Sequence, residues 1–404
     1  MKRLLIFASF FLYSFISFGQ YKSQLSRQQW IDSVFKTLND DEKIAQLMVL
    51  RTTALIDRKT MTIAYYDTSV AAAIQKYNIG AVCLFQGQVS WQANMINRLQ
   101  SLAKTPLMVC IDAEYGLGMR LLDSVRRYPY QLTLGAVQDP KIIYQYGTAV
   151  AKQLHRMGIH VNYAPDVDIN NNPNNPVIGY RSFGEDKYKV AAYGIQYMRA
   201  LQEHSIMACA KHFPGHGDVA VDSHYDLPVI NKSKSQLDSL ELYPFRQLFN
   251  AGVGSVMIAH LFIPAIDSGT NRATSISYNT ITGLMRNEIG YKGLTFTDAL
   301  EMKAIAKYYP SGENSVQSLI AGNDMLCLPG DADTCIMKVK EAIDQKRLSW
   351  ADIDNKVKKV LGAKYDYVIG NIKPVSVPNI VNDLNEDAGQ SDINGCKKFT
   401  HRCA

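Results

Sequence analysis

Eight short apolar runs recur along the chain, and this repetition constrains its fold more than any other feature of the sequence. Each run holds four to seven residues rich in Val, Ile, Leu and Met, without a clean alternation of apolar and polar side chains. Runs of this kind are typical of strands that are buried on both faces. They span residues 45–50, 79–85, 107–111, 159–163, 206–210, 255–259, 293–296 and 324–328.

Longer amphipathic stretches separate these runs. Residues 141–157 place apolar side chains on one helical face, and Gly158 follows where a helix commonly ends. Residues 186–202 and 235–250 predict helices in the same way, and the polar residues 39–42 indicate a helix start. Repeated strand–helix units predict an α/β fold, namely a (β/α)8 barrel of the TIM type in a single domain. An open doubly wound sheet is the alternative, but no GxGxxG motif in the required context supports it.

The two ends of the chain depart from this pattern. A basic start and an apolar run that reaches Phe18 predict that residues 1–20 are a secretory signal peptide, so we expect an exported protein, periplasmic or secreted. The run is short for a membrane span, and an uncleaved anchor is the alternative. We assign residues 21–370 to the barrel domain. Residues 371–404 predict a linker-like or disordered tail, with a truncated second domain as the alternative.

The charge and the cysteine content of the chain give no support for nucleic-acid binding, a disulfide framework or a cysteine zinc site. The formal net charge is +6, and a whole-chain charge this small gives no support for nucleic-acid binding. No dense basic run with interleaved aromatic residues is present. Four of the seven cysteines lie within apolar runs, where we expect small buried core residues: Cys83, Cys110, Cys209 and Cys327. We predict no disulfide, and no cysteine pair has the spacing of zinc ligands.

The densest group of chemically active side chains is KHFPGHGDVAVDSHYDLP, residues 211–228, directly after the fifth apolar run. Three of the eight histidines fall within 13 residues of this segment. Its glycines and prolines indicate a loop. Long polar loops at the carboxyl ends of barrel strands are where barrel enzymes hold their sites.

Three interpretations of this loop compete. The first is a solvated surface loop, and the second is a metal site, since His and Asp are both ligands, although no His-x3-His pair on a helix supports it. The third is acid/base catalysis. Asp222 and His224 are two residues apart, so their side chains share a face of an extended segment. A carboxylate beside an imidazole raises the imidazole pKa, which predicts a proton donor near neutral pH, and we favour this interpretation.

Further polar clusters also follow apolar runs. Asp298 ends the seventh run and Asp112 the third. Residues 162–168 and 181–186 follow the fourth run, and residues 257–260 lie at the end of the sixth. Any one of these clusters alone is readily explained by helix caps and turns. Because all of them follow strands, we expect them to converge on one end of the barrel.

These motifs resemble glycoside hydrolase family 3, and within it the β-N-acetylglucosaminidase branch. KHFPGHGD and the Asp-x-His pair that follows it carry the resemblance most specifically. IDAE, NYAPDVDI, RSFG and TDALEM occur in the family's order along most of the chain. The resemblance implies a catalytic barrel and a retaining mechanism. Relatives that act on glucosides place their acid in a second domain, so the Asp222/His224 pair favours N-acetylglucosaminides.

The resemblance also implies a role for individual residues. Asp298 resembles the catalytic nucleophile, and His224 resembles the acid/base, supported by Asp222. The positions that resemble those holding the sugar hydroxyls are Asp112, Arg120, Arg181, Lys211 and His212. Met257 and His260 resemble the next wall of the site. The resemblance implies neither a metal nor an organic cofactor.

We therefore expect an exported retaining β-N-acetylglucosaminidase. It is expected to remove terminal β-linked N-acetylglucosamine from peptidoglycan fragments or chito-oligosaccharides through a covalent glycosyl-aspartate. A phosphorylase or a β-glucosidase of the same family is the alternative, followed by a non-catalytic sugar-binding barrel or a metal-dependent hydrolase. The expected partner is a carbohydrate, with no nucleic acid and no stable membrane insertion after signal cleavage. We expect a monomer.

Overall fold

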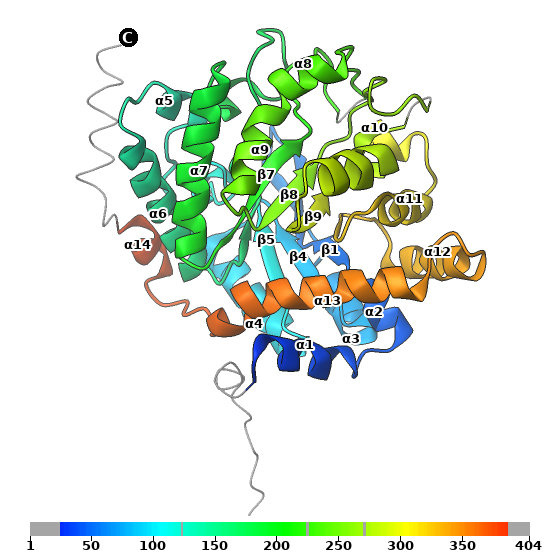
Figure 1. Ribbon diagram of the computed structural model, residues 1–404. Coiled ribbons are helices and arrows are strands. Elements are labelled where there is room, and N and C mark those ends of the chain that lie inside the picture. The colour runs from blue at the N-terminus through cyan, green and yellow to red at the C-terminus, as the bar shows by residue number, and fades with distance from the viewer. Residues whose placement is uncertain (1–24, 123, 224–225, 270–271, 387–404) are drawn as a thin grey trace, which may run out of the picture.

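Eight parallel strands form one sheet that closes into a barrel (Figure 1). The strands are β1 (Met48–Arg51), β4 (Ala81–Leu84), β5 (Met108–Ile111), β6 (Val161–Asn162), β7 (Met207–Phe213), β8 (Ser255–Ile258), β9 (Leu294–Thr297) and β10 (Leu326–Cys327). The computed structural model describes residues 25–122, 124–223, 226–269 and 272–386. β10 pairs with β1, and a bridge between Phe296 and Met325 closes the ring. The eight predicted strands and the (β/α)8 barrel are confirmed.

Helices follow the strands and form the outer layer. Those that follow barrel strands are α3 (Asp67–Tyr77), α4 (Val89–Leu102), α6 (Pro140–Arg156), α7 (Lys187–Glu203), α8 (Lys234–Ser239), α9 (Leu242–Asn250), the π-helix η5 (Asn279–Glu288), α10 (Lys303–Ala306), α11 (Glu313–Ala321) and α12 (Ala332–Asp344). Shorter or peripheral segments are α1 (Arg27–Phe35), α2 (Asp40–Ala45), α5 (Gln131–Gly135), α13 (Trp350–Tyr367), α14 (Ile380–Asn385) and the 3-10 turns η2 (Leu117–Met119), η3 (Gly179–Arg181), η4 (Thr274–Ile276) and η6 (Ile369–Asn371).

The predicted helices are observed, with one correction. Asn39 caps α2, and Gly158 follows α6 with a φ of +67°. The single helix predicted over residues 235–250 is wrong in its middle, where α8 ends and α9 begins. Pro244 lies in the first turn of α9. In a continuous helix its ring would clash with the carbonyl group of Leu240, four residues earlier, so the chain breaks between the two helices.

The helix α13 crosses the amino-terminal end of the barrel, in front of the strands in Figure 1. Lys364 of α13 donates a hydrogen bond to Gln46 Oε1 at 2.6 Å, just before β1. Lys359 of the same helix donates to Asp324 Oδ2 at 2.7 Å, just before β10. Because α13 covers this end, the opposite, carboxyl-terminal end of the strands is where a cavity can open.

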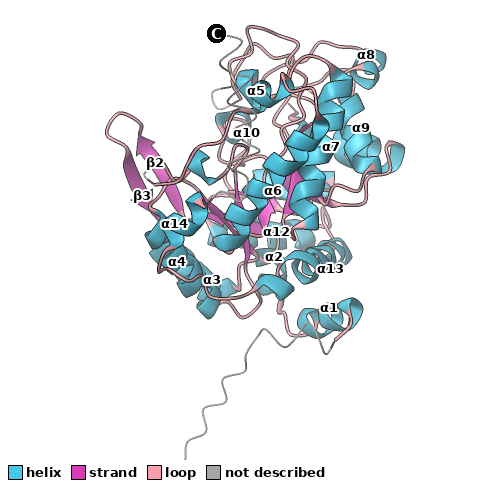
Figure 2. Cartoon of the chain, turned by 90° about the vertical axis from the view of Figure 1, so that its left-hand side faces the viewer, coloured by secondary structure: helices cyan, strands magenta, loops and turns pink. Residues whose placement is uncertain are grey.

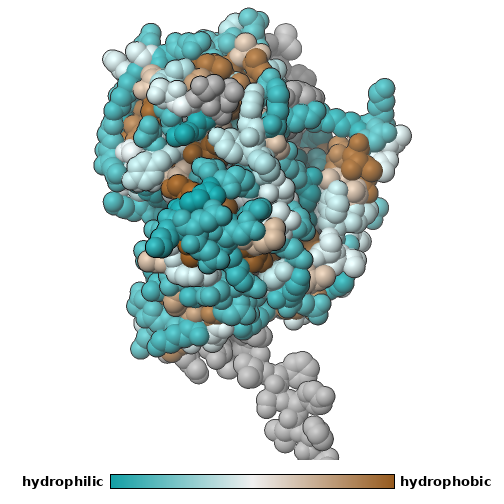
Figure 3. Space-filling view, turned by 90° about the vertical axis from the view of Figure 1, so that its right-hand side faces the viewer, coloured by the Kyte–Doolittle hydropathy of each residue, from teal (hydrophilic) through white to brown (hydrophobic). Residues whose placement is uncertain are grey.

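A two-stranded antiparallel hairpin is inserted between β1 and α3. It consists of β2 (Thr53–Asp57) and β3 (Thr62–Tyr65), and it projects from the body of the molecule (Figure 2). Its large apolar side chains are exposed, with 64% of Ile56 and 43% of Met61 accessible. In Figure 3 the hairpin projects on the right, and it carries a hydrophobic patch drawn in brown. The apolar pattern of the sequence does not predict this hairpin.

The segment 371–386, expected to be part of a linker-like or disordered tail, packs against α4 and α6. Arg156 Nη2 lies 2.7 Å from Asp383 Oδ2, and Leu384 is buried. Residues 387–404 lie outside the described residues, as does the predicted signal peptide. None of the helices in the described part of the chain has the length and hydrophobicity of a membrane-spanning helix.

The barrel core contains the four cysteines that were predicted to be buried. Cys83, Cys110, Cys209 and Cys327 are at most 4% exposed. Cys327 Sγ lies 3.9 Å from the hydroxyl oxygen of Tyr163, which is also buried. These thiols therefore act as small core residues, and burial raises the pKa of Cys209 to about 12.

Candidate active site

A cavity of about 380 Å³ opens at the carboxyl ends of the barrel strands. Phe85, Asp112, Asp298 and Leu328 line it, and each of them directly follows a strand. Its volume lies at the lower end of the range for small-molecule sites, about 300–1,000 Å³. The cavity therefore suits a ligand of the size of a single sugar.

The structure brings most of the predicted site residues together. Those that line the cavity are Asp112, Arg120, Arg181, Lys211, His212, Met257 and Asp298. Asp222 and His260 are described, but they do not line it. His224 lies outside the described residues. The chemical roles of these residues stay predictions, because position alone does not establish them.

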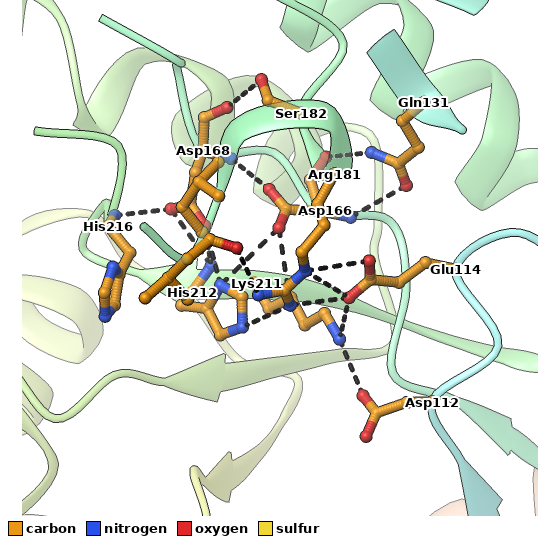
Figure 4. A network of polar contacts seen from close by, with 12 residues as sticks. Asp112, Glu114, Gln131, Asp166, Asp168, Arg181, Ser182, Lys211, His212 and His216 are labelled. Carbon is orange, nitrogen blue, oxygen red and sulfur yellow. Dashed lines mark hydrogen bonds and ion pairs between the residues drawn. The ribbon is translucent and has the colours of Figure 1, made fainter. Parts of the chain in front are cut away.

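Lys211 is a buried cation that binds two carboxylates. It lies on β7, and its Nζ is 2.7 Å from both Asp112 Oδ1 and Glu114 Oε1 (Figure 4). Arg120 Nη2 donates to the other oxygen of Asp112 at 2.7 Å. Burial alone would raise the pKa of Asp112, but Lys211 and Arg120 outweigh it and lower the pKa. The floor of the cavity is thus a fixed set of charged donors and acceptors.

Glu114 is fully buried between two cations. Arg181, at the end of η3, donates to it from Nε at 3.1 Å and from Nη2 at 2.7 Å. Burial opposes ionisation of Glu114, yet Arg181 and Lys211 lower its pKa. Arg181 Nη2 also lies 3.2 Å from His212 Nε2. Since a guanidinium group only donates, His212 Nε2 is the acceptor in this contact.

The other nitrogen of His212 binds Asp168. Nδ1 lies 2.7 Å from Asp168 Oδ2, so Nδ1 carries the proton of the neutral ring. Asp168 Oδ1 also accepts from the backbone N–H of His216 at 2.6 Å. Asp166 differs from its neighbour, because burial and the charge of Asp168 raise its pKa. Asp168 therefore orients the His212 ring. The raised pKa of Asp166 favours the protonated form of the Asp166 carboxyl group.

Asp166, Asp168 and His212 form a group whose ligand atoms lie within 4.8 Å of one another. Three such donors are a possible starting set for a metal ion. Here, however, His212 Nδ1 and Asp168 Oδ2 are already bonded to each other. Arg181 Nη2 stands 3.7 Å from Asp166 Oδ2, which places a positive charge where a cation would bind. The group therefore fits an internal polar network better than a metal site.

His216 connects the cavity to the loop that follows β7. Its Nε2 lies 3.3 Å from the hydroxyl oxygen of Ser223, and both residues line the cavity. Burial lowers the pKa of His216 to about 4. Asp222, the predicted partner of His224, is partly exposed, and its carbonyl oxygen accepts from Asp226 N at 3.2 Å. Ser223 stands between Asp222 and His224 in the sequence, and it lies at the cavity wall.

Asp298 lies in the cavity wall directly after β9. Its backbone N–H donates to Ile258 O at 2.9 Å, and its Oδ1 accepts from Ala299 N at 2.7 Å. The next helix, α10, starts only at Lys303, so Asp298 does not cap it. His260 lies behind this wall, fully buried, with Nε2 3.0 Å from Ala299 O. The predicted wall residue His260 thus supports the segment beside Asp298.

Four residues of the network were not assigned a role from the sequence: Glu114, Asp166, Asp168 and His216. All four are buried, and each lies within one of the polar segments that follow the apolar runs. Glu114 and Asp168 stand two residues after Asp112 and Asp166, a spacing that places side chains on one side of extended chain. That spacing is the signal that could have identified them.

Comparisons with known proteins give one consistent result. The sequence profile of the glycosyl hydrolase family 3 N-terminal domain matches residues 39–363. Beta-hexosaminidase A from Pseudoalteromonas piscicida is 36% identical over 278 residues, which cover 63% of this chain and 46% of that protein. Beta-hexosaminidase from Nitrosomonas eutropha is 30% identical, covering 63% of this chain and 75% of the relative.

Solved structures agree with this result. A glycoside hydrolase family 3 beta-N-acetylglucosaminidase from Paenibacillus sp. str. FPU-7 is 32% identical, with a TM-score of 0.79. The match covers 90% of this chain and 68% of that structure. The chain therefore spans about half of the Pseudoalteromonas relative and about two thirds of the Paenibacillus structure.

Proposed function

Because this chain belongs to glycosyl hydrolase family 3, we propose that it is a β-N-acetylhexosaminidase that releases a terminal sugar held in the cavity at the barrel mouth. The observation that carries the proposal is the position of Asp298 in the cavity that also holds Asp112, Arg181, Lys211 and His212. Fixed charged donors and acceptors suit the hydroxyl groups of one sugar. The names of the two similar hexosaminidases support a hexosamine substrate, and the name of the similar Paenibacillus structure, a beta-N-acetylglucosaminidase, supports the acetylated form.

The proposed reaction retains the anomeric configuration. A carboxylate oxygen of Asp298 forms a bond to the anomeric carbon as the bond to the leaving oxygen breaks, and the leaving oxygen takes a proton. Water then attacks the anomeric carbon and the bond to Asp298 breaks. The group that gave its proton to the leaving oxygen takes a proton from this water. Asp298 lines the cavity in which the sugar is proposed to bind. Its Oδ1 accepts a hydrogen bond from Ala299 N at 2.7 Å, which fixes the position of the carboxylate.

We propose His224 as the proton donor and Asp222 as its partner. Support comes from the Asp-Ser-His sequence and from Ser223, the middle residue of that sequence, which lines the cavity. A neutral imidazole repels an anion less than a carboxylate does, so phosphate in place of water is the alternative acceptor. We propose export on the basis of the amino-terminal sequence, and peptidoglycan fragments or chito-oligosaccharides as substrates.

The test is hydrolysis of a chromogenic β-N-acetylglucosaminide beside the matching β-glucoside, with and without added phosphate. The proposal expects turnover of the acetylated substrate and release of free sugar rather than a sugar phosphate. Asp298→Ala should lose activity by at least about a thousandfold, because no carboxylate remains to attack. The control variant, Asp366→Ala, removes a partly exposed carboxylate on α13 and should keep full activity. A preference for the glucoside would contradict the substrate class.

A further inference from the structure

The residues on either side of His224 contact each other and the wall of the cavity. The backbone N–H of Asp226 donates to Asp222 O at 3.2 Å. Ser223 is buried, and its hydroxyl oxygen lies 3.3 Å from His216 Nε2. Because Ser223 and His216 both line the cavity, these contacts fix the side of this segment that faces it.

The side chain of Asp226 binds the chain directly after α10. Its Oδ1 accepts from the hydroxyl group of Tyr308 at 3.2 Å and from the backbone N–H of Leu227 at 2.9 Å. Both carboxylate oxygens lie 3.3 Å from Lys307 Nζ. The hydrogen bond from Leu227 N and the contact with Lys307 lower the pKa of Asp226. The carboxylate is therefore ionised at neutral pH, as this contact with a cation requires.

The helix α10 belongs to the stretch of chain that follows Asp298. It begins at Lys303, and Met302 just before it lines the cavity. Ala304 N in α10 donates to Ser223 O at 3.3 Å. The segment that contains the proposed proton donor is thus attached to the segment that follows the proposed nucleophile. The relative position of the two reacting groups depends on these attachments.

The contacts of Asp226 are too exposed to contribute much to folding. The side chains of Asp226 and Lys307 are 50% and 53% accessible. Exposed ion pairs are weak, because water and salt screen them and two long side chains lose freedom. The geometry of a reaction is more sensitive, since a displacement of about 1 Å can reduce a rate about a hundredfold. Loss of Asp226 should therefore affect the reaction more than the stability of the fold.

We propose that Asp226 is a positioning residue for proton transfer to the leaving oxygen. Through Tyr308 and Lys307 it holds the segment around His224 against the end of α10, and so sets the position of the proton donor relative to Asp298. The inference rests on the proposed function and adds a residue to it. Asp226 acts through this segment and not by contact with the sugar, since it does not line the cavity.

The test compares two substrates whose leaving groups differ in their need for a proton. A dinitrophenyl β-N-acetylglucosaminide releases a stable anion, whereas the β-1,4-linked disaccharide of N-acetylglucosamine releases an alcohol that must be protonated. The measured quantities are kcat/KM for each substrate and the midpoint of urea unfolding.

The variants are Asp226→Ala, Tyr308→Phe and the combination of both. Asp41→Ala is the matched control, because Asp41 forms an exposed ion pair of the same type with Lys340 and lies in α2, just before β1. His224→Ala is the reference for a lost proton donor.

Asp226→Ala is expected to lower kcat/KM at least about tenfold for the disaccharide and less than about twofold for the dinitrophenyl glycoside. Its unfolding midpoint should equal that of Asp41→Ala, which keeps full activity on both substrates. Tyr308→Phe should show a smaller loss of the same kind. It should add nothing in the combined variant, because Tyr308 acts only through Asp226.

Equal losses on the two substrates, no loss on the disaccharide, or a lower unfolding midpoint than that of Asp41→Ala overturns the inference. His224→Ala separates this failure from a failure of the proposed function. It should show the same difference between the substrates with a larger loss. If it shows no difference, or if the wild type is inactive on both substrates, the proposed function and the inference fall together. If only Asp226→Ala lacks the difference, the inference alone is overturned.

Discussion

His260 Nε2 donates a hydrogen bond to the carbonyl oxygen of Ala299 at 3.0 Å, directly beside Asp298. Its Nδ1 lies 2.7 Å from the hydroxyl oxygen of Ser275, so both ring nitrogens have partners. We predict that His260→Ala lowers kcat at least about tenfold, because a small displacement of a reacting group costs much of the rate. KM for the chromogenic substrate should change little, since His260 does not line the cavity.

Steady-state kinetics separate this positioning role from direct binding. Ser275→Ala serves as the graded control: it removes one contact of the ring and should reduce kcat by a smaller factor. A variant His260→Ala with unchanged kcat and a raised KM would show that His260 contacts the sugar after all.

Glu114→Gln is predicted to destabilise the fold as well as the site. The change leaves the buried charges of Arg181 and Lys211 without one of their carboxylates. Breaking a buried ion pair from one side typically costs about 3–5 kcal/mol. Glu301→Gln is the matched control, because Glu301 also pairs with an arginine but its side chain is 42% exposed. Urea unfolding should show a large loss for Glu114→Gln and less than about 1 kcal/mol for Glu301→Gln. Equal losses would contradict this account.

Lys364 predicts an unusual dependence of stability on pH. Burial lowers the pKa of Lys364 to about 7, from an ordinary value of 10.5. Between these values the unfolded chain binds a proton that the folded chain does not, so the free energy of unfolding rises from pH 7 towards pH 10. The slope contributed by one such group is about 1.4 kcal/mol per pH unit. Lys359, with a pKa lowered by burial to about 8, acts in the same direction.

Lys364→Met should therefore raise the free energy of unfolding at pH 7 and flatten its rise towards pH 10. Lys358→Met, a change at an exposed position of the same helix, should do neither. Denaturant unfolding at pH 7, 8, 9 and 10 measures both effects. A Lys364→Met variant that is less stable than the wild type at pH 7 and keeps the full slope would contradict the prediction.

A chelator is predicted to leave activity unchanged. Asp168 is occupied by His212 and by the backbone of His216, and Arg181 lies beside Asp166, so the network holds its own charges without a cation. The measurement is hydrolysis of the chromogenic substrate after dialysis against EDTA. Loss of activity that zinc restores would favour the metal-dependent alternative.

The sequence predicted the barrel because its eight strands are buried on both faces and therefore form continuous apolar runs. The hairpin of β2 and β3 was missed because most of its side chains are exposed or partly exposed, so no buried apolar run marks its strands. The break between α8 and α9 depends on a single residue, Pro244, within an otherwise helical pattern. The helix α14 depends on contacts with Arg156 and Gln153, far away in the sequence.

The candidate site was predictable in part. Polar residues that follow strands identified Asp112 and Asp298, since the carboxyl ends of parallel strands meet at one end of a barrel. The partners of these residues follow no pattern in the sequence. Glu114 is a network residue only because Arg181, 67 positions away, reaches it. The acid/base assignment of His224 stays a prediction.

The central claim is that Asp298 attacks the anomeric carbon of a β-linked N-acetylhexosamine, and covalent trapping tests it most directly. The measurement is mass spectrometry of the protein and its proteolytic peptides after incubation with a 5-fluoro derivative of N-acetylglucosaminyl fluoride, which slows release of the sugar. The account predicts one added sugar, located on the peptide that contains Asp298, and none in Asp298→Ala. A label on another residue, or turnover of the substrate by Asp298→Ala at the wild-type rate, would contradict it.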